Sequence, residues 1–279
     1  MPQSLLAFIG GTGFDLRGPD SPFKNAHDGQ VETRFGIANV THATLEGRPV
    51  VFLHRHAQSD APQNRTVPPH RINYRANIAA LKKMGVTGIL ASTAVGGLRE
   101  EWASGTLVLL DQFLDVTTNR EKTFFDERAV HIDVTQPYCG HLRSLLLSVA
   151  GDLGIDLKDG GTYLCADGPR FETAAEIRTY ARWGADVVGM TGVPECSLAR
   201  EAEMSYVGVS IVTNAAAGIS PHPLSHREVT EAMQLALPNV ARLFLEAARR
   251  YEDDPNAPSR RATRDFVGAG FEPNEEIIA

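Results

Sequence analysis

The chain has 279 residues, of which 43% are hydrophobic and 22% charged, and its formal net charge is −7 at pH 7. This length can bury a sizeable core, as one large α/β domain or two small ones. The acidic balance argues against broad binding to nucleic acid or to an anionic membrane surface. It does not exclude a phosphate site, because a few local donors can hold an anion against an acidic background.

The cysteine pattern and the apolar runs suggest where the protein works. Cys139, Cys165 and Cys196 are far apart and form no CxxC pair, which supports neither a disulfide framework nor a zinc site. The N-terminal residues lack a basic region and a long apolar run, so we expect no signal peptide. No apolar stretch is long enough to span a bilayer. We therefore expect a cytoplasmic protein with no membrane partner and no metal site.

Short apolar runs typical of strands alternate with segments of helical spacing. The expected strands cover residues 5–9, 49–53, 86–91, 185–189 and 207–213. Helices are expected over residues 73–84, 142–153 and 173–183, around 197–203, and in a last segment with Val229, Met233, Leu237, Val240 and Phe244 on one stripe. Pro238 should kink or split this last helix. The alternation predicts an α/β sheet, in which ligands gather at strand ends.

Residues 251–279 differ from the rest of the chain. They are charged and show no clear period. We expect them to form a C-terminal tail that is either mobile or draped over a neighbouring subunit. No internal repeat or composition break marks a linker earlier in the chain, so residues 1–250 are taken as one domain.

Hydrogen-bond donors follow several of the expected strands. Residues 10–13, GGTG, let backbone amides approach an anion, although a tight turn alone is the commoner meaning of such glycines. Arg55 and His56 offer charged donors to phosphate oxygens, or are a surface arginine beside a capping histidine. Thr93-Ala94 and Thr191 follow two further strands. Four donor groups, each just after a strand, favour a shared oxyanion site.

A segment over residues 167–195 combines a Gly-Pro turn, an aromatic ring, a carboxylate and a strand end. These groups can hold a polar heterocycle that is attached to a sugar. From the residues alone, Phe171 could equally be a core aromatic. Glu172 could be an acid favoured by the dipole in the first turn of a helix.

The motifs and their order resemble the trimeric purine nucleoside phosphorylases, including the methylthioadenosine phosphorylase branch. The resemblance spans residues 6 to about 245 and is carried by IGGTG (9–13), RH (55–56), NYRAN (73–77), STAVGG (92–97), GTY (161–163), GPRFET (168–173), GADVVGMTGVPE (184–195) and VTN (212–214). It implies a single-domain nucleoside phosphorylase fold with a mixed central sheet flanked by helices. It also implies a homotrimer or a dimer of trimers, with sites near subunit interfaces. Inorganic phosphate would be the co-substrate, and no cofactor is expected.

The resemblance also implies roles for single residues. Phe171 would stack on the purine, Glu172 would accept the ring N1–H, and Asn214 would hydrogen-bond N7, which makes Glu172 and Asn214 the catalytic pair. Met190 would pack under the ribose. The phosphate site would consist of Thr12, Arg55, His56, Thr93, Ala94 through its amide, and Thr191.

The two remaining histidines point to different substituents at the 5′ position of the sugar. His226 aligns with a histidine that contacts a 5′-hydroxyl, although its register is open and Ser225-His226 could instead cap a helix. His131 resembles a residue of the methylthioadenosine phosphorylases that reaches the sugar pocket of the neighbouring subunit. The 5′ substituent is therefore left open between hydroxyl and methylthio.

Base preference is better indicated, because the branches of the family differ there. Methylthioadenosine phosphorylases typically have serine and aspartate in place of Glu172 and Asn214, and a second aspartate in place of Ala216. A glutamate at N1 requires a donor that hypoxanthine and guanine have and adenine lacks. We therefore expect reversible phosphorolysis of 6-oxopurine nucleosides: inosine, guanosine or 5′-methylthioinosine. S-methyl-5′-thioadenosine phosphorolysis is the alternative, and a non-catalytic nucleoside or anion sensor is the rival from another class.

Overall fold

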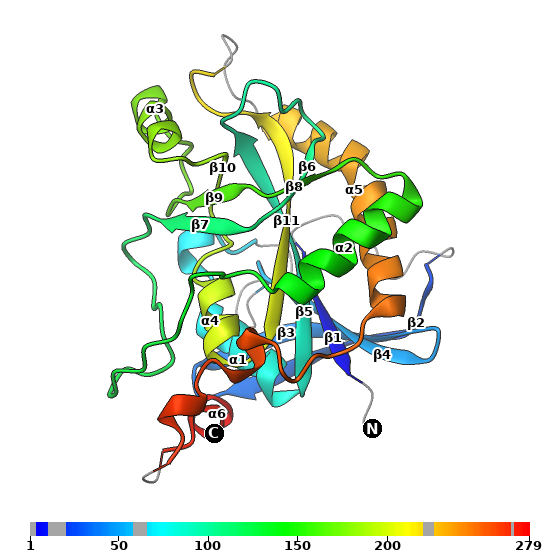
Figure 1. Ribbon diagram of the computed structural model, residues 1–279, viewed down its shortest axis with the longest axis vertical. Coiled ribbons are helices and arrows are strands. Elements are labelled where there is room, and N and C mark those ends of the chain that lie inside the picture. Colours follow the sequence, from blue (N-terminus) through cyan, green and yellow to red (C-terminus); the bar gives the residue numbers. More distant parts are fainter. Residues whose placement is uncertain (1–3, 11–20, 58–65, 220–225, 269–270) are drawn as a thin grey trace.

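The computed structural model describes residues 4–10, 21–57, 66–219, 226–268 and 271–279, with the backbone alone for residues 226–228. These parts form one eleven-stranded mixed sheet with helices on both faces (Figure 1), which confirms the predicted architecture. The strands are β1 (Leu5–Gly10), β2 (Phe23–Thr33), β3 (Gly36–Leu45), β4 (Arg48–His54), β5 (Val86–Gly97), β6 (Leu107–Leu109), β7 (Gln112–Asp115), β8 (Leu157–Asp159), β9 (Thr162–Cys165), β10 (Val187–Gly189) and β11 (Ser205–Ala215). The α-helices are α1 (Tyr74–Lys83), α2 (Gly140–Leu153), α3 (Ala174–Arg182), α4 (Glu195–Glu201), α5 (His226–Arg250) and α6 (Pro273–Ile278), with short 3₁₀ turns at Pro69–Arg71, Pro258–Arg261 and Arg264–Phe266.

The sheet changes partners along its longest strand, β5. The main path runs β2-β3-β4-β1-β5-β10-β9-β7, while β11 pairs with β5 and β6, and β8 pairs with β6. The first half of β5 is parallel to β1, and this pairing ends at Ile9 and Ala91. Beyond it, Gly96 and Gly97 pair antiparallel with β10. A sheet that changes partners in this way leaves a crevice beyond the ends of the strands, where ligands bind in open α/β sheets.

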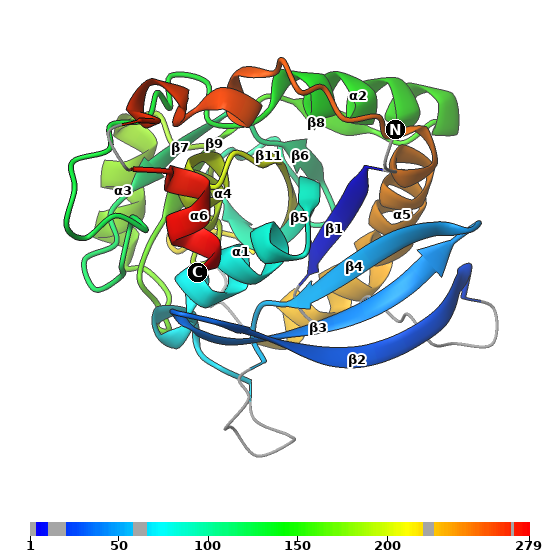
Figure 2. The same ribbon diagram turned by 90° about the horizontal axis from the view of Figure 1, so that it is seen from below.

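Strand β1 shows why its sequence is apolar throughout. Leu6 and Phe8 lie in the apolar cluster that contains residues of α2 and α5, whereas Ala7 and Ile9 lie in the cluster with α1 and α4. Successive side chains of a strand point to opposite faces. Because helices cover both faces of the sheet (Figure 2), this strand has no polar side.

The helix boundaries follow local capping chemistry. The Asn73 side chain accepts a hydrogen bond from the Ala76 N–H and starts α1. Thr173 and Glu176 form a capping box at the start of α3. Gly154 ends α2 with φ 65°. Helix α5 contains Pro238 but runs from residue 226 to residue 250 as one element, so the expected split does not occur.

The described residues after α5 pack on their own chain. Ser259, Thr263 and Ile277 are buried. The Glu203 carboxylate accepts hydrogen bonds from the N–H and hydroxyl of Thr263 and from the Asn274 amide. Glu203 lies far from these residues in the sequence, so a pattern within residues 251–279 does not reveal the contact. No helix in the described ranges has the length and apolarity needed to cross a lipid bilayer.

Candidate active site

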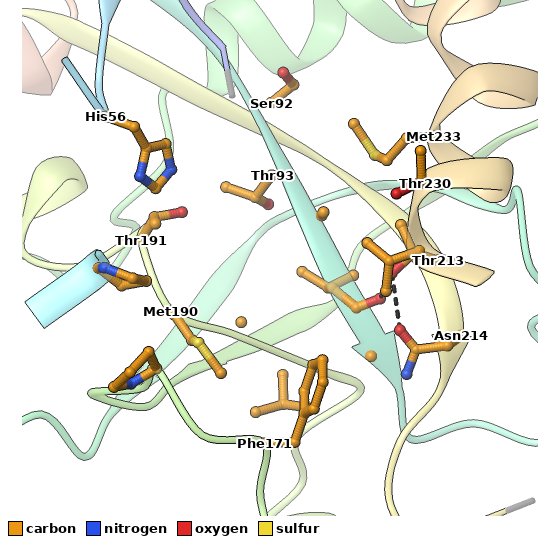
Figure 3. A pocket seen from close by; sticks show the side chains of 18 of the residues that line it. His56, Ser92, Thr93, Phe171, Met190, Thr191, Thr213, Asn214, Thr230 and Met233 are labelled. Carbon is orange, nitrogen blue, oxygen red and sulfur yellow. Dashed lines mark hydrogen bonds between the residues drawn. The ribbon is translucent and has the colours of Figure 1, made fainter. Parts of the chain in front are cut away.

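A cavity of about 550 Å³ lies where β5 exchanges β1 for β10 (Figure 3). Its walls come from β5, β10, β11, the loop after β4, the loop before α3, and one face of α5. Nine residues named from the sequence line this one cavity: Arg55, His56, Thr93, Ala94, Phe171, Glu172, Met190, Thr191 and Asn214. These nine residues come from five separate segments of the chain, which meet at this cavity.

Three other named residues are not found in the cavity walls. Thr12 lies outside the described residues, and His226 is the first residue of α5 with a side chain outside them. His131 is exposed in the loop between β7 and α2 and does not line the cavity of its own chain. Within the described residues, no group of three or more His, Cys, Asp and Glu side chains is arranged to hold a metal ion.

His56, Thr93 and Thr191 lie close together at one end of the cavity (Figure 3). The Thr93 hydroxyl is 2.9 Å from the Ser210 hydroxyl. The His56 Nδ1 lies 2.8 Å from the Val67 carbonyl oxygen. A carbonyl only accepts, so Nδ1 must carry a proton, and Nε2 is a lone pair whenever the ring is neutral. Burial lowers the pKa of His56 below its usual value, although the hydrogen bond to Val67 opposes this shift, and the nearby Arg55 adds to it.

Arg55 differs from the expectation that its donors face phosphate. Its Nε and Nη2 each donate to the Glu195 carboxylate at 2.7 Å, and Nη1 donates to the Ser92 carbonyl at 3.1 Å. The fork of donors is thus engaged by a protein carboxylate, and both side chains are 1% exposed. The pair fixes the end of β4 to β5 at Ser92, directly beside Thr93.

Glu195 ends the GADVVGMTGVPE motif, which predicted no role for it, but in the structure its carboxylate accepts hydrogen bonds from two side chains. Besides Arg55, it accepts the hydroxyl of Tyr206 at 2.7 Å. A buried carboxylate needs such partners, because removing a charge from water is costly. In the sequence, Glu195 directly follows Val193-Pro194 after a strand end. This position does not indicate which distant residues it contacts.

Phe171 and Asn214 lie away from His56 and Thr191 in the cavity (Figure 3), and Glu172, the neighbour of Phe171 in the chain, also lines it. Phe171 is 45% exposed, which is unusual for a phenylalanine and leaves its ring accessible from the cavity. Asn214 follows a register shift in the β5–β11 pairing. Its Oδ1 lies 2.9 Å from the Thr213 hydroxyl, and its Nδ2 donates to the Ala215 carbonyl at 2.9 Å. These bonds orient the amide and leave its second N–H without a hydrogen-bond partner among the described residues.

Met190 lies between the two ends of the cavity (Figure 3), and its side chain packs against Gly168. Gly168 has φ +67°, and a Cβ there would be 2.5 Å from the Met190 sulfur. Only glycine allows this backbone conformation and this contact together. The next two backbone N–H groups, of Thr191 and Gly192, donate to the Tyr163 hydroxyl at 3.1 Å.

Arg120 ties these segments together and was missed in the sequence. It donates to the carbonyls of Ala166 and Asp167 before the Gly168 turn, and to those of Met190 and Val193 on either side of Thr191. Its side chain is 2% exposed. It comes from a loop without periodicity, so no local pattern marks it. It is a positioning residue that connects two walls of the cavity.

The fold, with a cavity at the strand ends and polar groups at both ends of that cavity, is typical of α/β proteins that bind small polar ligands there. The Phosphorylase superfamily matches residues 6–249. A probable 6-oxopurine nucleoside phosphorylase of Dictyoglomus turgidum is 45% identical over 270 residues, covering 95% of this chain and 99% of the relative. A probable S-methyl-5′-thioinosine phosphorylase of Methanothermobacter thermautotrophicus is 40% identical, covering 98% and 93%.

A solved structure agrees in fold. A methylthioadenosine phosphorylase from an antarctic soil metagenomic library superposes with a TM-score of 0.85 at 28% identity, covering 99% of both chains. The chain belongs to the Phosphorylase superfamily and, within it, to the family of purine nucleoside and methylthioadenosine phosphorylases. It is an enzyme of the pentosyltransferase class.

Proposed function

We propose that this enzyme catalyses the reversible phosphorolysis of 6-oxopurine nucleosides to the free base and a ribose 1-phosphate. The observation that carries the proposal is that Glu172 and Asn214 line the same cavity. Glu172 supplies the acceptor that N1–H of a 6-oxopurine needs, and the free N–H of Asn214 supplies a donor to N7. The names of the relatives from Dictyoglomus turgidum and Methanothermobacter thermautotrophicus support the same base class.

Phosphate is proposed to bind at the end of the cavity where His56, Thr93 and Thr191 meet, with the Ala94 amide and Thr12. It attacks C1′ of the ribose with inversion while the bond to the purine breaks. Glu172 and Asn214 then stabilise the negative charge that grows on the leaving base, and the phosphate anion stabilises the cationic ribosyl group. The rate enhancement comes from positioning and electrostatics, and no protein nucleophile is needed. Arg55 acts through Ser92 and Glu195, by fixing the strand end that bears Thr93.

The 5′ substituent is proposed to face α5. Val229, Met233 and Leu237, spaced four residues apart, line this side of the cavity, and an apolar wall suits a thioether. This favours 5′-methylthioinosine as a second substrate. The alternative, S-methyl-5′-thioadenosine, places a lone pair of N1 against the Glu172 carboxylate and is therefore disfavoured.

A four-substrate comparison with and without phosphate tests the proposal. Inosine and methylthioinosine should be cleaved only when phosphate is present, and both faster than adenosine and methylthioadenosine. The assay follows release of the free base. Cleavage of inosine at the same rate without phosphate would identify a hydrolase instead.

His56 gives the phosphate site a pH dependence that can be isolated. Its Nδ1–H is held by Val67, so an anion at Nε2 is favoured only when the ring gains a proton. Because burial lowers the pKa of His56, the free ring is neutral near neutral pH, and anion binding takes up a proton. Affinity for a dianion should fall with rising pH, by up to about tenfold per pH unit.

Sulfate, which does not titrate near neutral pH, separates this effect from the titration of phosphate itself. Its inhibition constant against phosphate should rise with pH in the wild type and change little with pH in a His56→Gln variant. His141→Gln is the matched control, since His141 bonds the Glu252 carbonyl far from the cavity. Parallel pH profiles for wild type and His56→Gln would contradict the assignment.

The assembly and location follow from family membership as further proposals. We propose a cytoplasmic homotrimer in which His131, exposed in its own subunit, reaches the sugar pocket of a neighbour. Sedimentation analysis tests the trimer, and a monomer with full activity would refute it.

A further inference from the structure

A second, smaller cavity adjoins the candidate active site and shares one residue with it. This cavity has a volume of about 200 Å³ and is lined by Asp167, Arg170, Glu172, Glu176 and Tyr180, among others. Glu172 also lines the main cavity. Glu172, which is proposed to bind N1–H of the base, therefore also lines a second cavity, and that cavity contains charged side chains.

An ion pair in this second cavity holds the base-reading segment in place. Arg170 donates from Nη1 to the Glu176 carboxylate at 2.9 Å, from Nη2 to its other oxygen at 2.7 Å, and from Nη1 to the Phe171 carbonyl at 3.1 Å. Glu176 in turn accepts the Thr173 N–H at 2.7 Å. The bidentate pair thus closes a ring of hydrogen bonds around Phe171 and Glu172, at the start of α3.

The pair also places two opposite charges in the cavity that Glu172 lines. Burial raises the pKa of Glu172, a hydrogen bond with its own backbone lowers it, and smaller effects follow from the Glu176 carboxylate, which raises it, and the Arg170 guanidinium, which lowers it. Two other titratable groups line the same cavity. Burial, with Glu176 and Glu172, raises the pKa of the Tyr180 hydroxyl, which therefore stays neutral near pH 7. The Asp167 carboxylate is bonded to the Thr118 hydroxyl at 2.8 Å and lies 3.7 Å from Arg120 Nε.

We propose that Arg170 favours 6-oxopurines by balancing the charge of Glu176, so that Glu172 stays ionised in the cavity that all three residues line. The inference rests on the proposed function, since it concerns how the same site selects its purine. An ionised Glu172 accepts N1–H of a 6-oxopurine. A protonated Glu172 can instead donate to the N1 lone pair of a 6-aminopurine. Arg170 therefore favours 6-oxopurines, and Glu176 opposes it unless the two are paired.

Removing either partner should shift the titration of Glu172 in opposite directions. Arg170→Gln leaves the Glu176 carboxylate unbalanced and raises the pKa of Glu172, so hypoxanthine binding should begin to fail at higher pH. Glu176→Gln leaves Arg170 unbalanced and lowers the pKa of Glu172, so hypoxanthine binding should persist to lower pH. The expected shifts are about 0.5 pH unit, because the Arg170 side chain is 67% exposed and solvent screens its charge.

Calorimetric binding of hypoxanthine and adenine from about pH 5 to pH 8 measures these shifts without any turnover. Arg170→Lys keeps the charge and should keep the wild-type profile, and the double variant Arg170→Gln/Glu176→Gln should return towards it. Glu246→Gln, which breaks an Arg–Glu pair on α5 away from both cavities, is the matched control. Melting temperatures identify any variant that has lost its fold.

Opposite shifts of the two single variants support the inference, because a purely structural clamp would weaken binding in both without moving their titrations apart. Shifts in the same direction, or none in folded variants, overturn it. The phosphorolysis assay on the wild type is separate. If the variants show these opposite shifts but the wild type does not cleave inosine, the proposed function is refuted while the charge coupling between Arg170, Glu176 and Glu172 is supported.

Discussion

A variant that carries Glu172→Ser together with Asn214→Asp should use adenosine in preference to inosine. Serine removes the anion that opposes the N1 lone pair of adenine, and a protonated aspartate at residue 214 can serve N7 of a base whose 6-amino group needs acceptors. Inosine in turn loses the acceptor for its N1–H. An unpaired polar group in a closed site costs enough that the ratio of kcat/KM for inosine to that for adenosine should fall by about a hundredfold or more.

The single variants divide this change between the two positions. Glu172→Ser alone should reduce the ratio through loss of inosine activity, and Asn214→Asp should act chiefly once Glu172 is gone, because a second carboxylate beside Glu172 is unfavourable. Glu252→Ser, at an exposed glutamate after α5, is the control and should leave the ratio unchanged. A double variant that keeps its fold and the wild-type ratio would show that these residues do not select the base.

The elements around the site could be predicted because each carries a local signal. A run buried on both faces, such as residues 5–9, predicts a strand without knowledge of its partners, and the Asn73 and Thr173 caps mark helix starts. Strands β2 and β3 were missed, because they are paired to each other at the margin of the sheet (Figure 2) and their burial is irregular. Strand β5 was predicted to end at Ala91 but continues to Gly97. The continuation exists only because β10 and β11 pair with it, and such pairing is non-local.

The candidate site shows the same division between local and distant signals. Phe171, Glu172 and Asn214 could be named because each stands in a recognisable segment, and the structure brings all three to one cavity. The partner of Arg55 could not be named, since Glu195 lies 140 positions away. Arg120 acts through backbone carbonyls, which every residue type possesses, so its targets leave no trace in the sequence. The residues that are proposed to contact the ligand were therefore predictable, and the residues that hold them in place were not.

Removing Glu195 should cause the largest loss of stability of any single change considered for this chain. Glu195→Ala would leave the Arg55 guanidinium, 1% exposed, without its counter-charge, and would leave the Tyr206 hydroxyl without its acceptor. Breaking a buried pair by deleting one partner lowers the free energy of unfolding by about 3–5 kcal/mol. Urea unfolding of the variant and the wild type at equal protein concentration measures the difference. Glu100→Ala, at an exposed position, should change it by no more than about 0.5 kcal/mol.

A second variant separates the cost of an orphaned charge from the loss of the pair itself. Arg55→Met with Glu195→Leu removes both charges and roughly keeps the side-chain volume, so it should recover a large part of the stability lost in Glu195→Ala. It should not recover phosphate affinity, because the Ser92 carbonyl loses its Nη1 donor and Thr93 is no longer held beside His56. If Glu195→Ala is as stable as the wild type, the buried pair contributes nothing to folding. If the double variant restores stability and phosphate affinity together, the pair does not position the phosphate end of the cavity.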